Sequence, residues 1–176
     1  MVKTPPAMTS RTSERRHEKM IRTVDSPEAS YAEVGGETAM EPRMQRIEMT
    51  NGRVRVDSGS PWEPRMGYSR AMKSGPLITV AGCVGIEEDG SYPDTLGDQT
   101  RCALGRIEEA LETLGAGLEH LTRIRIYTTC IDRWEEIAEV MGPAMEAFRP
   151  PNALVEVARL VDEEALVEIE VDAWFE

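Results

Sequence analysis

The spacing of the apolar residues changes several times along the chain, and these changes restrict the fold more than any other feature. From 98 to 115 apolar residues recur at every third or fourth position, which places them on one face of a helix. The stretch LTRIRIYTTCI at 121–131 alternates between apolar and polar residues, as strands do. A second helical spacing covers 134–148, and two alternating stretches follow at 153–160 and 165–174. The sequence therefore predicts two helices set among strands.

Four more strands are predicted before the first helix. Two short alternating stretches, 44–49 and 53–58, flank Asn51-Gly52, a pair that tolerates the positive φ angles of a tight hairpin turn. Residues 68–72 and 77–81 are predicted as two further strands, separated by a Ser-Gly-Pro turn. This order of elements is typical of an α+β fold, with both helices on one face of a mixed sheet.

Residues at the ends of the two helices support these limits. Asp98 can accept hydrogen bonds from the free N–H groups at the start of the first helix, and we expect it to be the N-cap. Gly115 can adopt the left-handed conformation that ends a helix. Pro150 and Pro151 cannot continue the second helix, which we therefore expect to end before them.

One face of such a sheet would be covered by the helices, and the other would be open. The strands are rich in valine, isoleucine and leucine, so we expect the open face to be apolar. A large exposed apolar face usually packs against another protein surface. The simplest partner is another copy of the chain, and the sequence therefore predicts a homo-oligomer.

The length of 176 residues suits one domain with an additional segment. Residues 1–43 are rich in serine, threonine, proline, arginine and glutamate, and their apolar residues follow no period. Such a segment cannot bury enough apolar surface to offset its chain entropy. We therefore expect a disordered N-terminal extension at 1–43, followed by a folded domain at 44–176. Met40 and Met44 are alternative start sites within this interpretation.

The net charge of −12 disfavours several classes of partner. Residues 1–43 contain seven basic and seven acidic residues, so the whole negative excess belongs to 44–176. A surface this acidic disfavours nonspecific binding to nucleic acid and to anionic membranes, and we expect neither as a partner. The chain has no apolar run of about 20 residues and no apolar signal core, so we expect a cytoplasmic protein.

Cysteine and histidine are too few and too widely spaced to indicate a metal centre. The three cysteines, Cys83, Cys102 and Cys130, fit neither a disulfide framework nor a zinc pattern. The two histidines, His17 and His120, stand far apart in the sequence. We therefore expect no metal.

Several stretches resemble the Rid (YjgF-type) reactive-intermediate deaminase family. GYSRA at 67–71 resembles the family's P-Y-S-Q-A segment, and LITVAGCVG at 77–85 resembles its strand ending in S-G-Q. Residues 98–132 resemble its helix, glycine turn and Lys-Thr-Thr strand. The closest likeness is between VEVARL at 155–160 and VEIEVDA at 167–173 and the family's closing strands, V-E-V-A-x-L and V-E-I-E-A-x-A. Together these stretches span roughly residues 44 to 175.

This resemblance implies a chorismate-mutase-like α+β fold. It also implies a homotrimer, with the helices outside, the sheets packed into a central barrel and small-molecule clefts between neighbouring subunits. Well-known members of the family hydrolyse enamines and imines derived from amino acids, releasing ammonia and a 2-oxo acid without a metal or organic cofactor. The expected partner is therefore a small metabolite, and the expected cofactor is none.

The family's site residues transfer unevenly to this chain. Glu168 matches the glutamate that positions a water near the imine, and Tyr68 matches a tyrosine that lines the cleft. The family's substrate-binding arginine is replaced by Asn152, which is uncharged and cannot act as a two-pronged donor to a carboxylate. The family's ligand-holding S-G-Q turn corresponds to Ala81, Gly82 and Cys83, without the serine hydroxyl.

Each of these assignments has a simpler structural interpretation. Glu168 also fits an exposed strand residue, because charged residues continue at every second position after it. Tyr68 also fits a packing residue at the barrel edge, Cys83 a small buried hydrophobe, and Asn152 a turn former after two prolines. Arg70, two residues after Tyr68, either supplies the cation missing at position 152 or pairs with a surface carboxylate.

Three functions remain open from the sequence. The first is a hydrolase for imines or enamines, with a specificity altered by the missing arginine. The second is a trimer that binds a small metabolite without catalysis, and the third is a trimer that interacts with other proteins. Because Glu168 and Tyr68 are retained, we expect a working small-molecule cleft.

Overall fold

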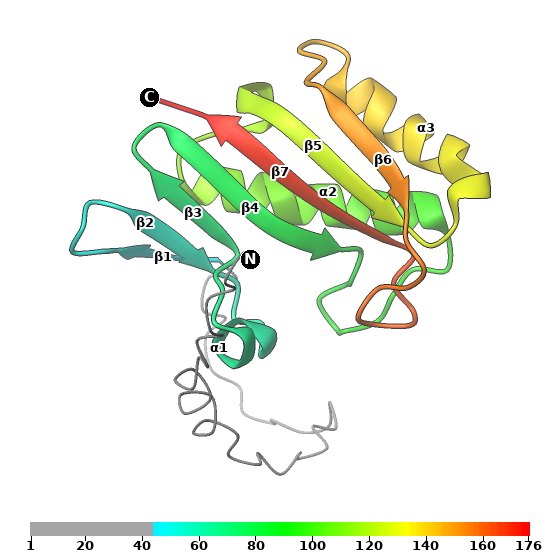
Figure 1. Ribbon diagram of the computed structural model, residues 1–176, viewed down its shortest axis with the longest axis horizontal. Helices are drawn as coiled ribbons and strands as arrows, with labels where there is room; N and C mark the ends of the chain where they lie inside the picture. Colours follow the sequence, from blue (N-terminus) through cyan, green and yellow to red (C-terminus); the bar gives the residue numbers. More distant parts are fainter. Residues whose placement is uncertain (1–43) are drawn as a thin grey trace, which may run out of the picture. The chain divides into compact units, whose positions relative to one another are not determined.

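The computed structural model describes residues 44–176, so the expected disorder of 1–43 lies outside the described part of the chain. The described domain contains one seven-stranded sheet in the order β1-β2-β3-β4-β7-β5-β6 (Figure 1). The strands are β1 (Gln45–Glu48), β2 (Val54–Asp57), β3 (Ala71–Ser74), β4 (Leu77–Val84), β5 (Leu121–Thr128), β6 (Asn152–Glu156) and β7 (Val167–Trp174). The α-helices are α1 (Trp62–Met66), α2 (Leu96–Thr113) and α3 (Trp134–Met145), with short 3-10 turns at Leu118–His120 and Ile131–Arg133.

The sheet is mixed because two crossovers place strands in parallel. Helix α2 connects β4 to β5, and both of these strands run antiparallel to β7, which lies between them. Helix α3 connects β5 to β6, and these two strands pair directly in parallel. The remaining neighbours, β1-β2, β2-β3 and β3-β4, pair antiparallel. The α+β class and the mixed sheet predicted from the sequence are confirmed.

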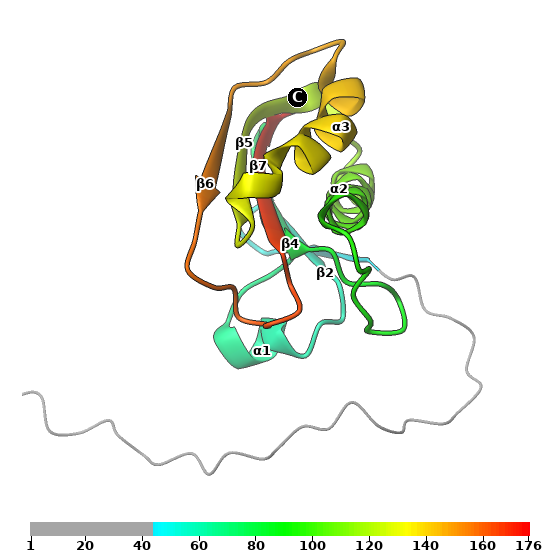
Figure 2. The same ribbon diagram turned by 90° about the vertical axis from the view of Figure 1, so that its right-hand side faces the viewer.

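Helices α2 and α3 cover one face of the sheet (Figure 2). The predicted helical stripe is confirmed, because α2 buries residues at three- and four-residue spacing, namely Ala103, Ile107, Ala110 and Leu111. They belong to the same apolar core as the buried residues of β7, which are Val167, Ile169, Val171 and Ala173. Because alternate residues of a strand point to opposite faces, this core also fixes which β7 residues face away from the helices.

The centre of the open face is polar, so the expectation of an apolar open face is wrong there, although the strands also carry the exposed apolar residues Leu77, Val155 and Trp174. The β7 residues between the buried ones are Glu168, Glu170 and Asp172, and each is only partly buried. In β5 the corresponding partly exposed residues include Arg125 and Tyr127. The valine and isoleucine side chains of these strands point toward the helices instead. An uncovered apolar face therefore gives no support for a homo-oligomer, and the trimer rests on the family resemblance alone.

The segment before β3 differs from its prediction. The strand expected at 68–72 is present but displaced, because β3 covers Ala71–Ser74 and Tyr68 lies in the turn that follows α1. Helix α1 was hidden from the sequence pattern by Pro61 and Pro64. Prolines are tolerated in the first turn of a helix, where the backbone N–H groups have no partner within the helix. Pro61 and Pro64 therefore lie at the start of helix α1, and not in a loop alone.

The start of α2 also shifts slightly from its prediction. Thr95, and not Asp98, is the N-cap, and its hydroxyl oxygen accepts a 3.0 Å hydrogen bond from the Asp98 backbone N–H. The Asp98 carboxylate accepts a 2.7 Å bond from the same hydroxyl. Gly115 follows the helix with a φ of 81°, as predicted. None of the helices within 44–176 combines the length and apolar character needed to cross a bilayer.

Candidate functional site

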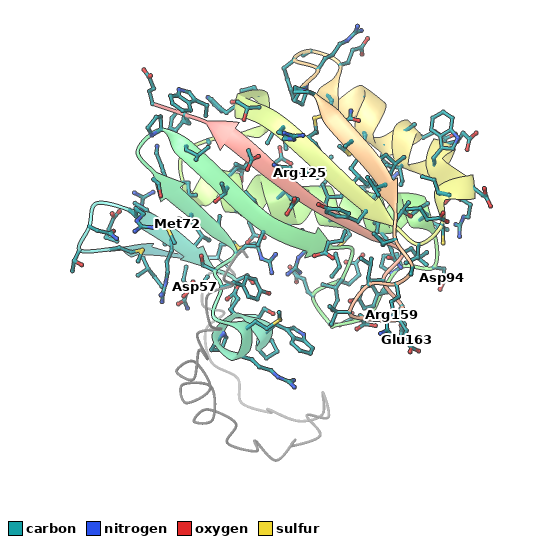
Figure 3. The ribbon with its side chains drawn as sticks, viewed as in Figure 1. Asp57, Met72, Asp94, Arg125, Arg159 and Glu163 are labelled. Atoms are coloured by element: carbon teal, nitrogen blue, oxygen red, sulfur yellow. The ribbon has the colours of Figure 1, made fainter. Side chains whose placement is uncertain are left out.

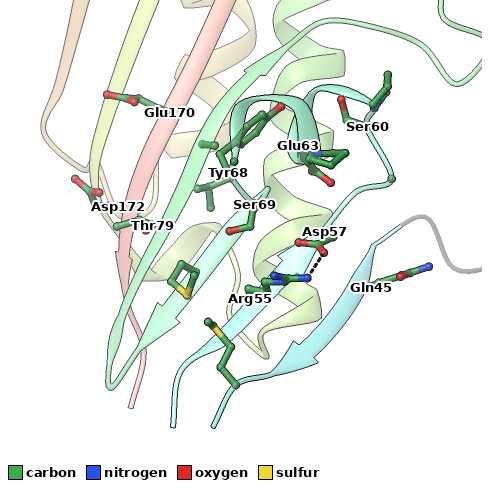
Figure 4. Close-up of a pocket in the computed structure, with 18 of the residues that line it drawn as sticks. Gln45, Arg55, Asp57, Ser60, Glu63, Tyr68, Ser69, Thr79, Glu170 and Asp172 are labelled. Carbon is green, nitrogen blue, oxygen red and sulfur yellow. Dashed lines mark ion pairs between the residues drawn. The ribbon is translucent and has the colours of Figure 1, made fainter. Parts of the chain in front are cut away.

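An open concavity of about 990 Å³ lies on the polar side of the sheet. Its wall is α1 with the adjoining turns, and its floor comes from strands on both sides of β4. Figure 3 shows Asp57, Met72 and Arg125 on three separate strands of this region. In the close-up, Tyr68 and Glu63 lie on the α1 side, while Glu170 and Asp172 project from β7 (Figure 4). Of the predicted site residues, Tyr68 and Ala81 line this concavity.

Tyr68 is held in place by the turn that ends α1. Gly67 has a φ of 71°, a left-handed conformation that favours glycine, and both Gly67 and Tyr68 donate their backbone N–H groups to the Glu63 carbonyl, at 2.9 and 3.1 Å. The Glu63 carboxylate is buried and accepts hydrogen bonds from the backbone N–H and hydroxyl of Ser58, at 3.0 and 2.8 Å. This wall is therefore tied to the end of β2.

A β-bulge in β4 places Gly82 next to Glu168. The pairing of β4 with β7 shifts between Val80, opposite Val171, and Cys83, opposite Ile169, so β4 has one extra residue. A Cβ atom on Gly82 would lie 1.9 Å from the Glu168 carboxylate oxygen Oε1. Only glycine therefore permits this approach of the carboxylate to the strand.

Arg70 fixes the bulge from inside the protein. Its side chain is almost fully buried, and its Nη1 group donates to the Gly82 carbonyl at 2.6 Å and to the Ala81 carbonyl at 3.4 Å. The same group lies 3.4 Å from the Cys83 sulfur, and Nη2 donates to the Tyr68 hydroxyl at 3.2 Å. Both terminal nitrogens of the guanidinium are therefore engaged by the protein, whereas the buried Nε has no hydrogen-bond partner in the described part of the chain and lies 3.9 Å from Glu63. The hypothesis that Arg70 supplies a cation to a ligand stays a prediction.

Glu168 is the half-buried carboxylate of this group. Burial raises its pKa, the positive charge of Arg70 opposes this rise, and the Glu170 carboxylate adds to it. Among the described residues, no side chain or backbone group donates a hydrogen bond to its oxygens. Such a carboxylate can bind a water molecule and accept its proton at a pH closer to neutrality than an exposed glutamate does.

Cys83 lies beneath the bulge with its side chain buried. Burial raises the pKa of its thiol, an effect that the nearby charge of Arg70 only partly opposes. A thiol that stays protonated is a poor nucleophile, so the structure favours the interpretation of Cys83 as a small buried residue. Within 44–176, no group of three histidine, cysteine, aspartate or glutamate side chains is arranged to hold a metal ion.

A polar network on the open face was not identified from the sequence. Arg125 of β5 pairs with two carboxylates of β7, at 3.3 Å from Glu170 and 3.0 Å from Asp172. The Tyr127 hydroxyl donates to Glu170 at 3.1 Å, and this hydrogen bond raises the pKa of the Tyr127 phenol. The alternating stretches RIRIY at 123–127 and EIEVD at 168–172 predict on which face of the sheet each side chain lies. The pairing depends on the register between two strands more than 40 residues apart, which alternation does not reveal.

Asn152 lies apart from this group within one chain. It begins β6, which is separated from β7 by β5, and its side chain lines a different concavity of about 610 Å³ beside α3. That groove also includes Trp134, Met141 and Leu154. Tyr68, Arg70, Ala81, Gly82, Cys83 and Glu168 are thus brought together, and Asn152 is not. Its predicted place in the same cleft requires a neighbouring copy and stays a prediction.

Comparison with known proteins agrees with this arrangement. The sequence profile of the family described as Endoribonuclease L-PSP matches residues 59–175. SCO2049 of Streptomyces coelicolor is 35% identical over 133 residues, which cover 72% of this chain and 96% of that protein. The RutC family protein PH0854 of Pyrococcus horikoshii is 30% identical over 111 residues, with coverage of 62% and 87%.

A solved structure extends the agreement to the fold. The crystal structure of Rv2704 from Mycobacterium tuberculosis, described as a member of the YjgF/YER057c/UK114 family, matches with a TM-score of 0.65. The two chains are 46% identical, and the match covers 69% of this chain and 98% of Rv2704. The profile match includes both the Tyr68 turn and the Glu168 strand. The chain therefore belongs to the Endoribonuclease L-PSP family, which also carries the names YjgF, RutC and UK114.

Proposed function

We propose that this protein binds a small imine or enamine beside Glu168 and hydrolyses it to a carbonyl compound and ammonia. The observation that carries this proposal is the half-buried Glu168 carboxylate, which has a raised pKa and lies against Gly82 without a hydrogen-bond donor among the described residues. A carboxylate in this state is suited to general base catalysis near neutral pH.

The reaction needs only a water molecule as a second reactant. The imine reacts in its protonated form. Glu168 accepts a proton from water as the water oxygen bonds to the iminium carbon, and the C=N π electrons move to the nitrogen and neutralise it. The resulting carbinolamine then loses ammonia when the C–N bond breaks, the nitrogen receives the proton held by Glu168, and the hydroxyl loses its own proton to solvent. The carboxylate is thereby regenerated, and the carbonyl product leaves.

The other residues of the group would orient this step. The Tyr68 hydroxyl is held by Arg70 at the edge of the concavity, where it can contact a ligand. Ala81, at the start of the bulge, also lines the concavity. We also propose a cytoplasmic homotrimer in which a neighbouring copy brings its Asn152 to the cleft, because one chain alone leaves that residue across the sheet.

The charge of the chain does not favour ribonuclease activity, although the family name refers to one. RNA binding depends largely on basic groups that contact phosphates. The concavity is lined by four acidic and two basic residues, and the chain has a net charge of −12. We therefore propose a small metabolite, and not nucleic acid, as the ligand.

The test is the decay of an imine generated in solution, measured with and without the protein. We expect the wild type to accelerate ammonia release and Glu168→Gln to lose about 100-fold or more of that acceleration, as expected for removal of a general base. Glu163→Gln, at an exposed position in the turn before β7, is the matched control and should retain full activity. Equal activity of Glu168→Gln and wild type would refute the proposed mechanism.

A second function is favoured by two departures from the family pattern. Ala81 and Asn152 replace the serine and arginine that hold the ligand in the resembling family. A trimer that binds a metabolite without hydrolysing it is consistent with both replacements. This function would be supported if no imine were hydrolysed while a small molecule bound to the wild type and not to Tyr68→Ala.

A further inference from the structure

The positive charges that line the concavity are already paired. Arg55 lies 3.0 Å from Asp57, a pair marked in Figure 4. Arg125 lies 3.3 Å from Glu170 and 3.0 Å from Asp172, so one guanidinium faces two carboxylates. Glu63 is a further acidic residue of the lining, and no lysine belongs to it. A ligand entering this space would meet an excess of negative charge.

The charges behind the lining do not reverse this excess. Arg70 is the nearest additional cation, but its Nη groups donate to the Ala81 and Gly82 carbonyls and to the Tyr68 hydroxyl. Its Nε lies 3.9 Å from the buried Glu63 carboxylate, and the Glu168 carboxylate of β7 lies across from the bulge, against Gly82. Within residues 44–176, each guanidinium that lines the concavity, Arg55 and Arg125, therefore already has a carboxylate within 3.3 Å. Asn152 would add no charge from a neighbouring copy.

We propose that the substrates are imines without an adjacent carboxylate, bound as the protonated iminium cation. This inference rests on the proposed function and narrows it to one substrate class. A carboxylate on the substrate would be repelled by Glu168, Glu170 and Asp172, whereas an iminium would be attracted by them. The reaction then converts an iminium and water to an aldehyde or ketone and ammonium, with the bonds made and broken as above.

The preference follows from differential binding in the transition state. Because Glu168 is neutralised when it accepts the proton, the repulsion of a substrate carboxylate in the transition state comes from Glu170 and Asp172, which share a single Arg125. An iminium loses its positive charge as water attacks, while Glu168 loses its negative charge by accepting the proton. The two changes offset each other, so the site needs no additional cation to complete the step.

A matched pair of imines tests this inference. Oxidation of 2-phenylethylamine and of phenylalanine by the corresponding oxidases yields two imines that differ only in the carboxylate, and ammonia release reports their hydrolysis. We expect kcat/KM to be at least about tenfold higher for the imine without the carboxylate, which corresponds to one charge interaction in a partly exposed site. Equal values, or a preference for the carboxylate, would overturn the inference and leave the proposed hydrolysis intact. No acceleration of either imine would refute the proposed function, and this inference with it.

Two variants identify the source of the preference. Asp172→Asn leaves Arg125 with one carboxylate partner, and Asn152→Arg introduces a guanidinium at the position that differs from the family pattern. Each variant should have a higher kcat/KM for the carboxylate-bearing imine, which reduces the preference for the other imine by several-fold or more. Asp132→Asn, at an exposed position outside the concavity, is the charge-matched control and should leave the ratio unchanged. If the ratio of the two kcat/KM values changes equally in Asp132→Asn, the net charge of the protein, and not this site, determines the preference.

Discussion

Two concavities of the domain, the one around the β4 bulge and the one beside α3, are built in opposite ways. Around the β4 bulge, Arg70 joins Tyr68, Ala81 and Gly82 through hydrogen bonds of 2.6 to 3.4 Å, and Glu168 lies against Gly82. Beside α3, the groove that contains Asn152 is lined mainly by apolar side chains, and Trp134 there is 49% exposed.

The difference shows that one chain by itself fixes the residues around the β4 bulge, whereas it leaves Trp134 and Asn152 of the groove beside α3 exposed. A buried guanidinium with several partners leaves little freedom to the backbone it holds, so the bulge is organised before any ligand arrives. The α3 groove has no comparable network among its described residues, so its role depends on what covers it. Changes in the first region should therefore be costly, and changes in the second should be mild unless a neighbouring copy packs there.

Arg70→Met is the change with the largest expected effect. It removes the Arg70 donor from the Gly82 and Ala81 carbonyls and the 3.9 Å partner of Glu63, so we expect a loss of about 3 kcal/mol in the free energy of unfolding. Denaturant unfolding at fixed protein concentration measures it. Arg149→Met, in the α3 groove, should change stability by less than about 0.5 kcal/mol because Arg149 is exposed. Similar losses in both variants would remove the contrast between the regions.

Gly82→Ala should separate activity from stability. The new Cβ would collide with the end of the Glu168 side chain, which can rotate away, so we expect about 100-fold lower imine hydrolysis with less than about 1 kcal/mol of destabilisation. Gly142→Ala is the matched change in α3, where nothing lies within 4 Å of the added atom. It should stabilise the protein by about 0.5 to 1 kcal/mol and retain activity. Full activity of Gly82→Ala would show that the position of Glu168 is unimportant.

Because the pKa of Glu168 is raised, its contribution to stability and its activity as a base should change in opposite directions as the pH rises. The folded protein holds the Glu168 proton more tightly than the unfolded chain does, so this residue's contribution to stability falls as the pH rises from the ordinary glutamate value, about 4.3, through the raised pKa. Hydrolysis should instead rise about tenfold per pH unit below that pKa, because the ionised form is the base.

Glu168→Gln tests both parts of this linkage. The variant should unfold at a higher temperature than wild type at pH 7, and the difference should disappear below about pH 4, where Glu168 is protonated in both states. Thermal unfolding across this pH range is the measurement. A variant that is less stable than wild type at pH 7 would mean that ionised Glu168 stabilises the fold, contrary to the direction of its pKa shift.

The sequence predicted most of the sheet, both long helices and the facing of β7, because these depend on local periodicity. Tyr68, Gly82 and Glu168 were identified through a resemblance, and the structure brings them together. Two features, the polarity of the open face and the role of Arg70, did not follow from the local pattern. The valine and isoleucine content of β5 and β7 does not show that these side chains all lie on the helix-covered face.

The role of Arg70 also depended on information that alternation does not contain. Its partners Ala81 and Gly82 face it only because β4 carries an extra residue opposite β7, and a bulge shifts every contact beyond it. In the same way, the pairing of Arg125 with Glu170 and Asp172 follows from the register of β5 against β7. Both contacts depend on the long-range register between strands, which the type and order of the residues in one strand do not reveal.

Asn152→Ala is the smallest expected change, and it tests the contrast most sharply. Within one chain the Asn152 side chain is exposed at the start of β6, so the free energy of unfolding should change by less than about 0.5 kcal/mol. If a neighbouring copy places Asn152 in the cleft, KM should nevertheless rise by about threefold or more, since a hydrogen bond to the ligand contributes roughly 0.5 to 1.5 kcal/mol. Stability and KM both unchanged would show that Asn152 only forms the turn after Pro151, and that the cleft belongs to the bulge alone.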